Sequence, residues 1–323
     1  MPARQHKTPA GAAPGRAAGE ELLEQASGRY AAGALGDARR LAGQALSVLR
    51  DTEGRRSAAL VRALLLAGQI EQDAGRHDAA ERSFQQASMV SQELADAAPV
   101  RVQAQLALAI LRRVQGRYPE AEALLRATLQ MAETTVGADA MEVAAICNAL
   151  GITGKYTGHF DKAEAWYRRA LDITALVLGP DHPDIAAIYH NLGGLDHARG
   201  AFDRAEAPAR RAVEIRQRAC GPQHLAVAAD KAALASILDA LGRPGEAEAL
   251  LSDALAVFER ALGADHYEVA ITLHNLAAIT HRRRDLAQAE TLYRRALAIK
   301  EDVLGHDHPE LATTLNNLSL IHI

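Results

Sequence analysis

The chain has 323 residues, of which 49% are apolar, 4% aromatic and 24% charged, and its formal net charge is −4 at pH 7. Abundant Ala and Leu with few aromatic residues favour an all-helical protein, and the weakly negative charge argues against nucleic acid as a partner. Two cysteines, Cys147 and Cys220, cannot form a disulfide framework, and the sequence has no 18-residue apolar run to span a membrane.

The first 19 residues differ in composition from the rest of the chain. They are rich in Ala, Gly, Pro and basic residues and contain no apolar run, so they do not form a secretory signal. We expect a disordered leader over 1–19 and a cytoplasmic protein.

From residue 20 onward, one small residue recurs every 42 positions, with a single step of 41. This Ala column consists of Ala38, Ala80, Ala121, Ala163, Ala205, Ala247 and Ala289. Such a period is typical of a solenoid, in which each unit buries its apolar face against its neighbours. Five positions before the Ala column stands a Gly that can end a helix with a left-handed backbone, and Arg284 replaces it in the last full copy.

These columns predict one pair of helices in each repeat. The expected pairs lie near 20–49, 57–95, 100–134, 140–176, 183–218, 225–260 and 267–303, with a partial unit over 309–317. No composition shift interrupts this stretch, so we expect a single solenoid domain over 20–317.

The segments between consecutive repeats carry Gly followed by Asp and His, as in LGPDH and LGHDH. The Gly can end the second helix, the Asp or His can cap the next helix, and Pro183 and Pro309 fit a first helical turn. Metal ligation is the alternative for the recurring pairs Asp181 with His182, Asp265 with His266, and Asp307 with His308. These pairs lie a whole repeat apart, too far to share one ion at ligand distances of about 2.0–2.2 Å, so we predict no metal and no cofactor.

Two segments share further residues, including an LG-x-DHP connector and an Asn-Leu pair. They are GHFDKAEAWYRRALDITALVLGPDHPDIAAIYHNLG (158–193) and LAQAETLYRRALAIKEDVLGHDHPELATTLNNL (286–318). The pattern resembles tetratricopeptide repeats of the 42-residue kind found in kinesin light chain and its bacterial relatives. The resemblance implies an all-α, right-handed superhelix of about seven helix pairs plus a partial eighth. An excess of Arg over Lys, 31 against 5, indicates a GC-rich bacterial genome.

In this family the first helix of each pair lines the inner groove of the superhelix, which implies a groove position for residues 15 and 14 before the Ala column. The polar residues there are Asn148, His190, Asn191, His274, Asn275, Asn316 and Asn317. An Asn amide can both donate to and accept from an extended peptide, and the resemblance gives this role to Asn191, Asn275 and Asn317. Ala149 and Ala233 interrupt the series. The alternative is that these Asn residues bridge adjacent first helices.

A second column, eight residues before the Ala column, is largely basic. It consists of Arg113, Lys155, His197, Asp239 and His281, with Arg282 beside the last. These charges would favour an acidic peptide or one bound by its C-terminal carboxylate. The alternative is a solvated surface, because long cationic side chains commonly cover helices without binding a ligand.

The sequence therefore predicts a non-catalytic scaffold that binds an extended peptide or partner segment in its groove. It contains no GxSxG, HExxH, phosphate-loop or dinucleotide-binding motif. The alternative function is the sensor arm of a larger protein with a switch ATPase or a caspase-like protease as effector. Residues 318–323, LSLIHI, resemble the translation of a transposon end used in sequencing-library preparation, so we expect a non-native tail and a native chain that continues past 317. An unusual terminus that dimerises or frays is the other explanation.

Overall fold

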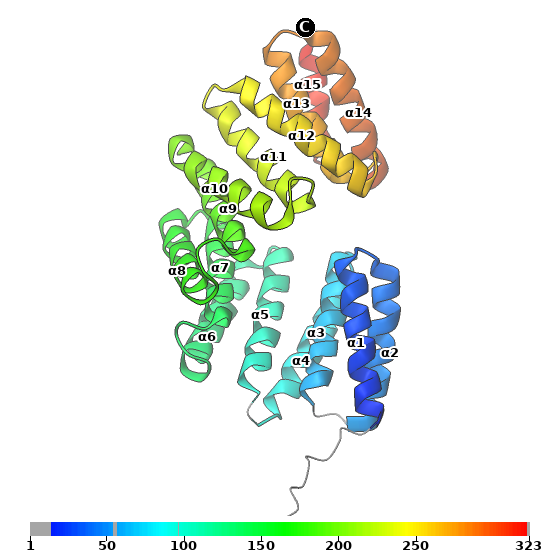
Figure 1. The fold of residues 1–323 in the computed structure, drawn as a ribbon. Coiled ribbons are helices and arrows are strands. Elements are labelled where there is room, and N and C mark those ends of the chain that lie inside the picture. Colours follow the sequence, from blue (N-terminus) through cyan, green and yellow to red (C-terminus); the bar gives the residue numbers. More distant parts are fainter. Residues whose placement is uncertain (1–13, 54–56, 96, 322–323) are drawn as a thin grey trace, which may run out of the picture. The chain divides into compact units, whose positions relative to one another are not determined.

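The computed structural model describes residues 14–53, 57–95 and 97–321, and all regular secondary structure in these ranges is helical. Fifteen helices, α1 to α15, follow one another along the described chain (Figure 1). They confirm the prediction of seven helix pairs and a partial eighth. The helices group into two compact units, Met1–Thr157 (unit 1) and Gly158–Ile323 (unit 2), where the sequence predicted one continuous domain. Within each unit a helix contacts only helices one or two places away in the chain, so no core extends over the whole array.

Unit 1 contains three helix pairs and one further first helix. These are α1 (Pro14–Ala31) with α2 (Leu35–Glu53), α3 (Ala58–Asp73) with α4 (His77–Gln92), α5 (Ala98–Val114) with α6 (Tyr118–Thr135), and α7 (Met141–Tyr156). The two helices of each pair are separated by Gly33, Gly75 or Gly116, whose φ angles are 75°, 72° and 74°. Because only Gly adopts this conformation without steric cost, the Gly column does mark the end of the first helix.

The helical part of the chain begins earlier than predicted, because α1 starts at Pro14 and not near residue 20. Residues 1–13 of the predicted leader lie outside the described residues. The added turn packs against the end of α2 through two glycines: a Cβ on Gly15 would collide with the Thr52 side chain, and a Cβ on Gly19 would lie 2.7 Å from the Leu49 side chain. Gly15 and Gly19, which the composition assigned to a leader, are therefore packing residues of a helix.

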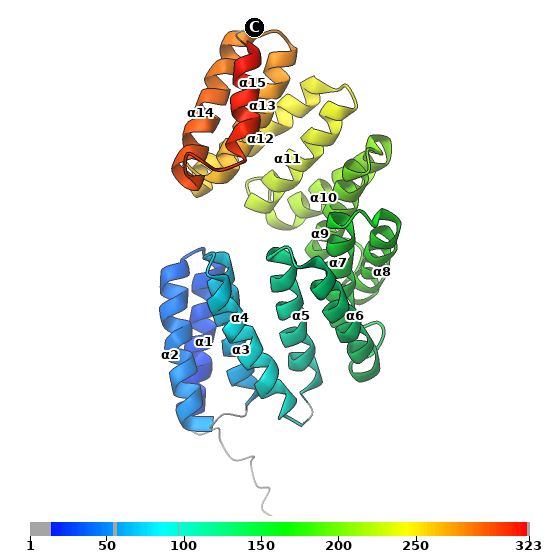
Figure 2. The same ribbon diagram turned by 180° about the vertical axis from the view of Figure 1, so that it is seen from behind.

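Unit 2 begins with a second helix and continues with three pairs and a last first helix. These are α8 (Phe160–Leu178), α9 (Pro183–Ala198) with α10 (Phe202–Cys220), α11 (Leu225–Ala240) with α12 (Pro244–Leu262), α13 (Tyr267–Arg282) with α14 (Leu286–Leu304), and α15 (Leu311–Ile321). The red helix α15 packs against α13 and α14 (Figure 2). Residues 318–321 of the predicted tail belong to α15, and residues 322 and 323 lie outside the described residues.

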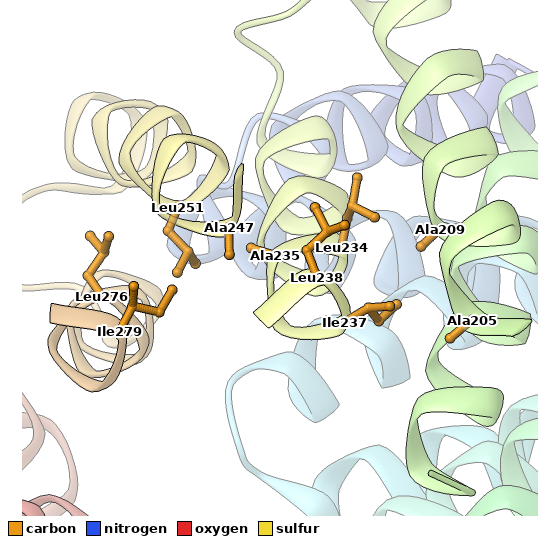
Figure 3. Packing of buried hydrophobic residues seen from close by; sticks show 10 residues of the cluster. All are labelled: Ala205, Ala209, Leu234, Ala235, Ile237, Leu238, Ala247, Leu251, Leu276 and Ile279. Atoms are coloured by element: carbon orange, nitrogen blue, oxygen red, sulfur yellow. The ribbon is translucent and has the colours of Figure 1, made fainter. Parts of the chain in front are cut away.

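The Ala column forms the interior of both units, and all seven of its side chains are fully buried. In unit 2, Ala205 of α10 lies opposite Ile237 of α11, and Ala247 of α12 packs beside Ala235 (Figure 3). Small side chains let the helices approach closely, and Leu and Ile side chains such as Leu251 fill the space between them. The periodic Ala residues therefore pack both within a repeat, as Ala247 does, and between successive repeats, as Ala205 does.

His residues cap the first helices of unit 2. The Nδ1 atoms of His182, His224 and His266 each accept a hydrogen bond from the backbone N–H two residues later, at 3.2, 3.1 and 3.2 Å. His308 makes the same contact at 3.3 Å just before α15. The sequence predicted an Asp or His cap, and the structure selects His. Pro183 occupies the first turn of α9 as expected, whereas Pro309 precedes α15 by two residues.

Candidate functional site

All the predicted groove residues lie on first helices, but they belong to two separate units. Unit 1 carries Arg113 on α5 and Asn148 and Lys155 on α7. Unit 2 carries His190, Asn191 and His197 on α9, His274, Asn275, His281 and Arg282 on α13, and Asn316 and Asn317 on α15. The structure places each of them on the first helix of its repeat, and their place in a groove and their role in binding stay predictions.

Three consecutive first helices of unit 2 line a hollow of about 280 Å³, which we call the α9–α11–α13 pocket. Its polar lining consists of His197, Ser236, Asp239 and Asn275, and the remainder is mostly apolar. The pocket thus brings together two predicted groove residues, His197 and Asn275, from two different repeats. Its volume is slightly below the range of about 300–1,000 Å³ for drug-sized ligands, so it suits a single side chain or a short stretch of backbone.

Sequence reasoning missed Ser236 as a pocket residue and treated Asp239 only as a member of a charged column. Both lie on α11, three residues apart, and therefore on the same face of that helix. Ser236 Oγ donates to the backbone carbonyl of Ala232 at 3.3 Å. The i, i+3 spacing of two polar residues in the otherwise apolar second half of α11 was the available signal.

The positive charge predicted for the unit 2 surface is partly neutralised. Arg282 donates a hydrogen bond to the Asp239 carboxylate, which is itself part of the α9–α11–α13 pocket. His197 packs edge-on against the ring of Phe202, with 5.3 Å between the ring centroids. Unit 2 therefore offers hydrogen-bonding groups around an ion pair and not an uninterrupted basic surface.

Unit 1 carries the two long cationic side chains of the predicted basic column, Arg113 and Lys155, on first helices that contact each other. Neither has a carboxylate partner among the described residues, and the Nε atom of Arg113 is buried without a hydrogen-bond acceptor there. Burial lowers the pKa of Lys155, whose Nζ atom lies 6.0 Å from the centroid of the Tyr156 ring. These are the cations of the predicted groove that an incoming carboxylate could pair with.

His190 of α9 is held by a buried carboxylate. Its Nδ1 atom lies 2.8 Å from Oδ1 of Asp230 on α11, and the Asp230 side chain is 1% exposed while that of His190 is 39% exposed. The other oxygen, Oδ2, lies 3.0 Å from Nε of Arg216 on α10, an ion pair without the alignment of a hydrogen bond. The Nδ1 atom of the imidazole is thus anchored, and the His190 side chain remains partly exposed.

His274 occupies the same repeat position on α13 but has different neighbours. Its Nδ1 atom lies 3.0 Å from Oγ1 of Thr314 on α15, and Nζ of Lys300 on α14 lies 3.3 Å from the same hydroxyl oxygen. Burial, with a smaller contribution from the Lys300 charge, lowers the pKa of His274 to about 4. Burial also lowers the pKa of Lys300. At neutral pH the His274 ring is therefore uncharged.

The Asn residues of the predicted ladder do not share one environment. Asn275 lines the α9–α11–α13 pocket, and Asn316 is exposed on α15. Asn317 donates from Nδ2 to the hydroxyl of Tyr293 on α14 at 3.1 Å, so it joins a first helix to a second helix. Asn148 and Asn191 are half-buried on α7 and α9. Asn275 is thus the ladder residue that the structure places in a hollow.

A family model of the tetratricopeptide repeat matches residues 101–175, 156–218, 209–260, 227–302 and 268–323. These matches run without a break from residue 101 to residue 323, over more than half of the chain. The chain belongs to the tetratricopeptide repeat family. Such repeats generally serve as non-catalytic scaffolds for protein–protein interaction, and no curated protein matches the sequence closely enough to narrow that role.

Solved tetratricopeptide repeat structures include proteins of the kinesin light chain type, as the resemblance predicted. BtubC (BKLC) from P. vanneervenii is 25% identical over 76% of this chain and 93% of that chain, with a TM-score of 0.56. A putative kinesin light chain from Podospora anserina with nearly identical TPR-like repeats is 23% identical over 64% of this chain and 98% of that chain, with a TM-score of 0.54.

A signal transduction ATPase with numerous domains and a tetratricopeptide repeat sensor, from Pyrococcus horikoshii, is 14% identical over 94% of this chain and 44% of that chain, with a TM-score of 0.68. The likeness to this protein and to the Podospora protein shows the fold alone. Within the described part of this tetratricopeptide repeat protein, no helix has the length and apolarity to cross a membrane. The same part contains no cluster of three or more His, Cys, Asp or Glu side chains placed to hold a metal ion.

Proposed function

We propose that this tetratricopeptide repeat protein binds an extended segment of a partner protein along its first helices. The observation that carries the proposal is the α9–α11–α13 pocket, where His197, Ser236 and Asn275 from three repeats line one small hollow. An Asn amide and a Ser hydroxyl supply both donors and acceptors, which suits the alternating N–H and C=O groups of a peptide backbone. A hollow of about 280 Å³ could receive one side chain of that segment.

We further propose that unit 1, taken by itself, favours an acidic segment of a partner. Arg113 and Lys155 support this, because no carboxylate among the described residues pairs with either and both are half-buried. A carboxylate of a partner would form charge-assisted hydrogen bonds with these side chains. Arg282 contributes less, because it already pairs with Asp239.

The groove assignment can be tested with a peptide selected from a random display library on the immobilised full chain. The double variant Asn191→Ala with Asn275→Ala should weaken binding of that peptide about fivefold to about 150-fold, since each of two lost hydrogen bonds costs roughly 0.5–1.5 kcal/mol. The helical circular-dichroism signal should stay unchanged. Ser252→Ala, on an exposed position of the second helix α12, is the matched control and should bind normally. Unchanged affinity of the double variant would contradict the groove assignment.

The charge preference is tested separately with Arg113→Gln and Lys155→Gln. Both variants should weaken a selected acidic peptide and reduce the salt dependence of its binding, because screening acts on exposed charge pairs. A selected peptide without Asp, Glu or a required C-terminal carboxylate would contradict this part of the proposal.

A second proposal is that the chain is the sensor arm of a longer protein with a switch ATPase or a caspase-like protease as effector. The observation that favours it is the shared fold with a repeat sensor in a STAND ATPase, of which this chain matches 44%. Sequencing the gene past the codon for residue 317 in its native host tests it directly. An effector domain would bring its own phosphate loop or a Cys–His pair, and a stop codon after one more helix would refute the proposal.

A further inference from the structure

Two of the predicted groove histidines of unit 2, His190 and His274, occupy equivalent positions 84 residues apart, and each is backed by an equivalent pair of polar side chains. His190 is backed by Asp230 and Arg216, and His274 by Thr314 and Lys300. The repeat between them has Ala232, Thr272 and Phe258 at the same three positions. Thr272 bonds its own helix backbone, and Phe258 is a buried apolar residue. The polar arrangement is thus specific to the repeats that carry a groove His.

At His190 the buried carboxylate decides which ring nitrogen carries hydrogen. Asp230 faces the guanidinium of Arg216 and, as a carboxylate, can only accept hydrogen bonds. At a separation of 2.8 Å, Nδ1 of His190 must therefore be the donor. In the neutral ring this leaves Nε2 with a lone pair and no hydrogen.

At His274 the same reasoning gives the opposite result. The Lys300 ammonium can only donate, so Thr314 Oγ1 accepts from it at 3.3 Å. The Thr314 hydroxyl then has its own hydrogen to give, and its remaining hydrogen-bond neighbour among the described residues is Nδ1 of His274 at 3.0 Å. Nδ1 is therefore an acceptor, and in the neutral ring the hydrogen sits on Nε2.

We propose that His190 and His274 are held in opposite ring tautomers, so that one repeat position presents a hydrogen-bond acceptor on α9 and a donor on α13. Asp230 and the Lys300–Thr314 pair act as positioning residues. Neither Nε2 atom has a hydrogen-bond partner in the described part of the chain, and the neutral state of His274 near pH 7 follows from its lowered pKa. This use of the histidines for recognition rests on the proposed function.

The consequence is a recognition rule for the bound segment. An acceptor at His190 Nε2 suits a backbone N–H or a hydroxyl of the partner, and a donor at His274 Nε2 suits a carbonyl or carboxylate oxygen. If both histidines held the same tautomer, the two positions could not distinguish a donor of the partner from an acceptor. Opposite tautomers therefore favour one register of an extended segment whose N–H and C=O groups alternate.

The experiment is a long-range ¹H–¹⁵N correlation spectrum of the ¹⁵N-histidine-labelled full chain without any ligand, above the pKa values of free imidazoles. His190→Gln and His274→Gln assign the two rings. We expect the hydrogen on Nδ1 at His190, favoured by at least about tenfold because its acceptor is a carboxylate, and on Nε2 at His274, favoured by a smaller factor because its donor is a neutral hydroxyl. The same tautomer at both rings, or the reverse assignment, would overturn the proposal.

Grafting the partners tests their positioning role. Thr314→Asp with Lys300→Arg should move the hydrogen of His274 to Nδ1, and Asp230→Thr with Arg216→Lys should move that of His190 to Nε2. Unchanged tautomers in well-folded grafts would show that these residues do not position the rings. If a grafted variant does not fold, the wild-type spectrum still decides whether the two rings hold opposite tautomers. The tautomers are measured without a ligand, so tautomers other than those expected would overturn this proposal and leave the groove assignment untouched. Loss of the groove assignment in the peptide-binding experiment would likewise leave the tautomers measurable.

Discussion

Units 1 and 2 are built from the same repeat, but within the described residues only unit 2 buries Asp or Lys side chains. The buried polar residues of unit 1 are hydroxyls, such as Thr128 and Thr153, which bond the backbone of their own helices. Unit 2 buries Asp196, Asp230 and Lys300, and the last two contact side chains of neighbouring helices. Both units place ion pairs between neighbouring repeats, such as Arg112 with Glu81 in unit 1, but those of unit 1 stay partly exposed. Unit 2 differs in adding buried charges, Asp230 and Lys300, to the same small and apolar columns.

The largest expected effect measures how much the apolar columns stabilise unit 1. Phe84 is 1% exposed and packs on Gly68, where a Cβ would collide with its ring. Phe84→Ala should lower the free energy of unfolding of unit 1 by about 3–5 kcal/mol through the cavity it leaves. Hydrogen exchange should show lost protection in α3 to α5 and retained protection in α12 to α14, because repeats contact only their neighbours.

The control for this variant is Met89→Ala on the same helix, since Met89 is 67% exposed. It should change the stability by no more than about 0.5 kcal/mol. Equal loss of protection in both units after Phe84→Ala would break the comparison, because the two units would then unfold as one.

The second comparison is between the stability contributions of two side-chain clusters in unit 2, His190 with Asp230 and Arg216, and His274 with Thr314 and Lys300. Asp230→Ala should cost about 3 kcal/mol, because it leaves the largely buried Arg216 without its counter-charge and His190 Nδ1 without an acceptor. Thr314→Val, which removes one neutral hydroxyl of similar shape, should cost only about 1 kcal/mol. Urea denaturation followed by circular dichroism measures both. An equal loss in the free energy of unfolding for Thr314→Val and Asp230→Ala would show that the buried charge of Asp230 does not make the His190 cluster more important for stability than the His274 cluster.

A third, smaller effect concerns the Gly column, which is complete in unit 1 and broken in unit 2. Arg284 adopts a φ of 67°, a left-handed conformation that costs a non-glycine residue about 1–2 kcal/mol. Arg284→Gly should therefore raise the stability by roughly 1 kcal/mol, and Gly116→Ala in unit 1 should lower it by a similar amount. Thermal denaturation of the two variants is the measurement, and a destabilised Arg284→Gly would mean that this side chain makes a compensating contact.

The smallest effect is a pH dependence that unit 2 has through His274. Its pKa is about 4 in the folded state against 6.5 for the unperturbed group, so the unfolded state binds more protons between these values. Stability should be independent of this group above about pH 6.5 and should fall as the pH drops toward about 4. The ring is partly exposed, so solvent screening limits the size of the effect.

The check is the difference between the wild type and His274→Gln in urea denaturation from about pH 7.5 to about pH 5, above most carboxylate titrations. The variant should be less dependent on pH over this range. Parallel curves for the two proteins would show that His274 titrates at its unperturbed value.

Much of the fold could be predicted from the residues alone. The Ala and Gly columns placed the helix pairs to within a few residues, because burial of a small side chain and a left-handed backbone each tolerate few residue types. The start of α1 was missed because Gly15 and Gly19 resemble leader composition until Thr52 and Leu49 are seen to pack on them. Similarly, the connector pattern predicted a cap but could not choose His over Asp, since both can accept from a backbone N–H.

The candidate site was predicted less completely. The repeat register gave His197 and Asn275 a place on first helices, but only the structure showed that Ser236 and Asp239 complete the hollow between them. The basic column predicted a positive surface, and the contact between Arg282 and Asp239 reduces it in unit 2. Partners 43 residues apart in sequence leave no local signal, because their pairing depends on the stacking of adjacent repeats.

The sequence by itself determined that this protein is a stack of two-helix repeats, because a fixed period of small residues can be buried in only one way when each repeat packs on the next. The tertiary structure alone decided which polar side chains meet behind and within the predicted groove. His190 with Asp230 and His274 with Thr314 are each 40 residues apart and come together only through helix packing. The hydrogen-bonding character of each imidazole is therefore a property of the packed repeats and not of the local sequence.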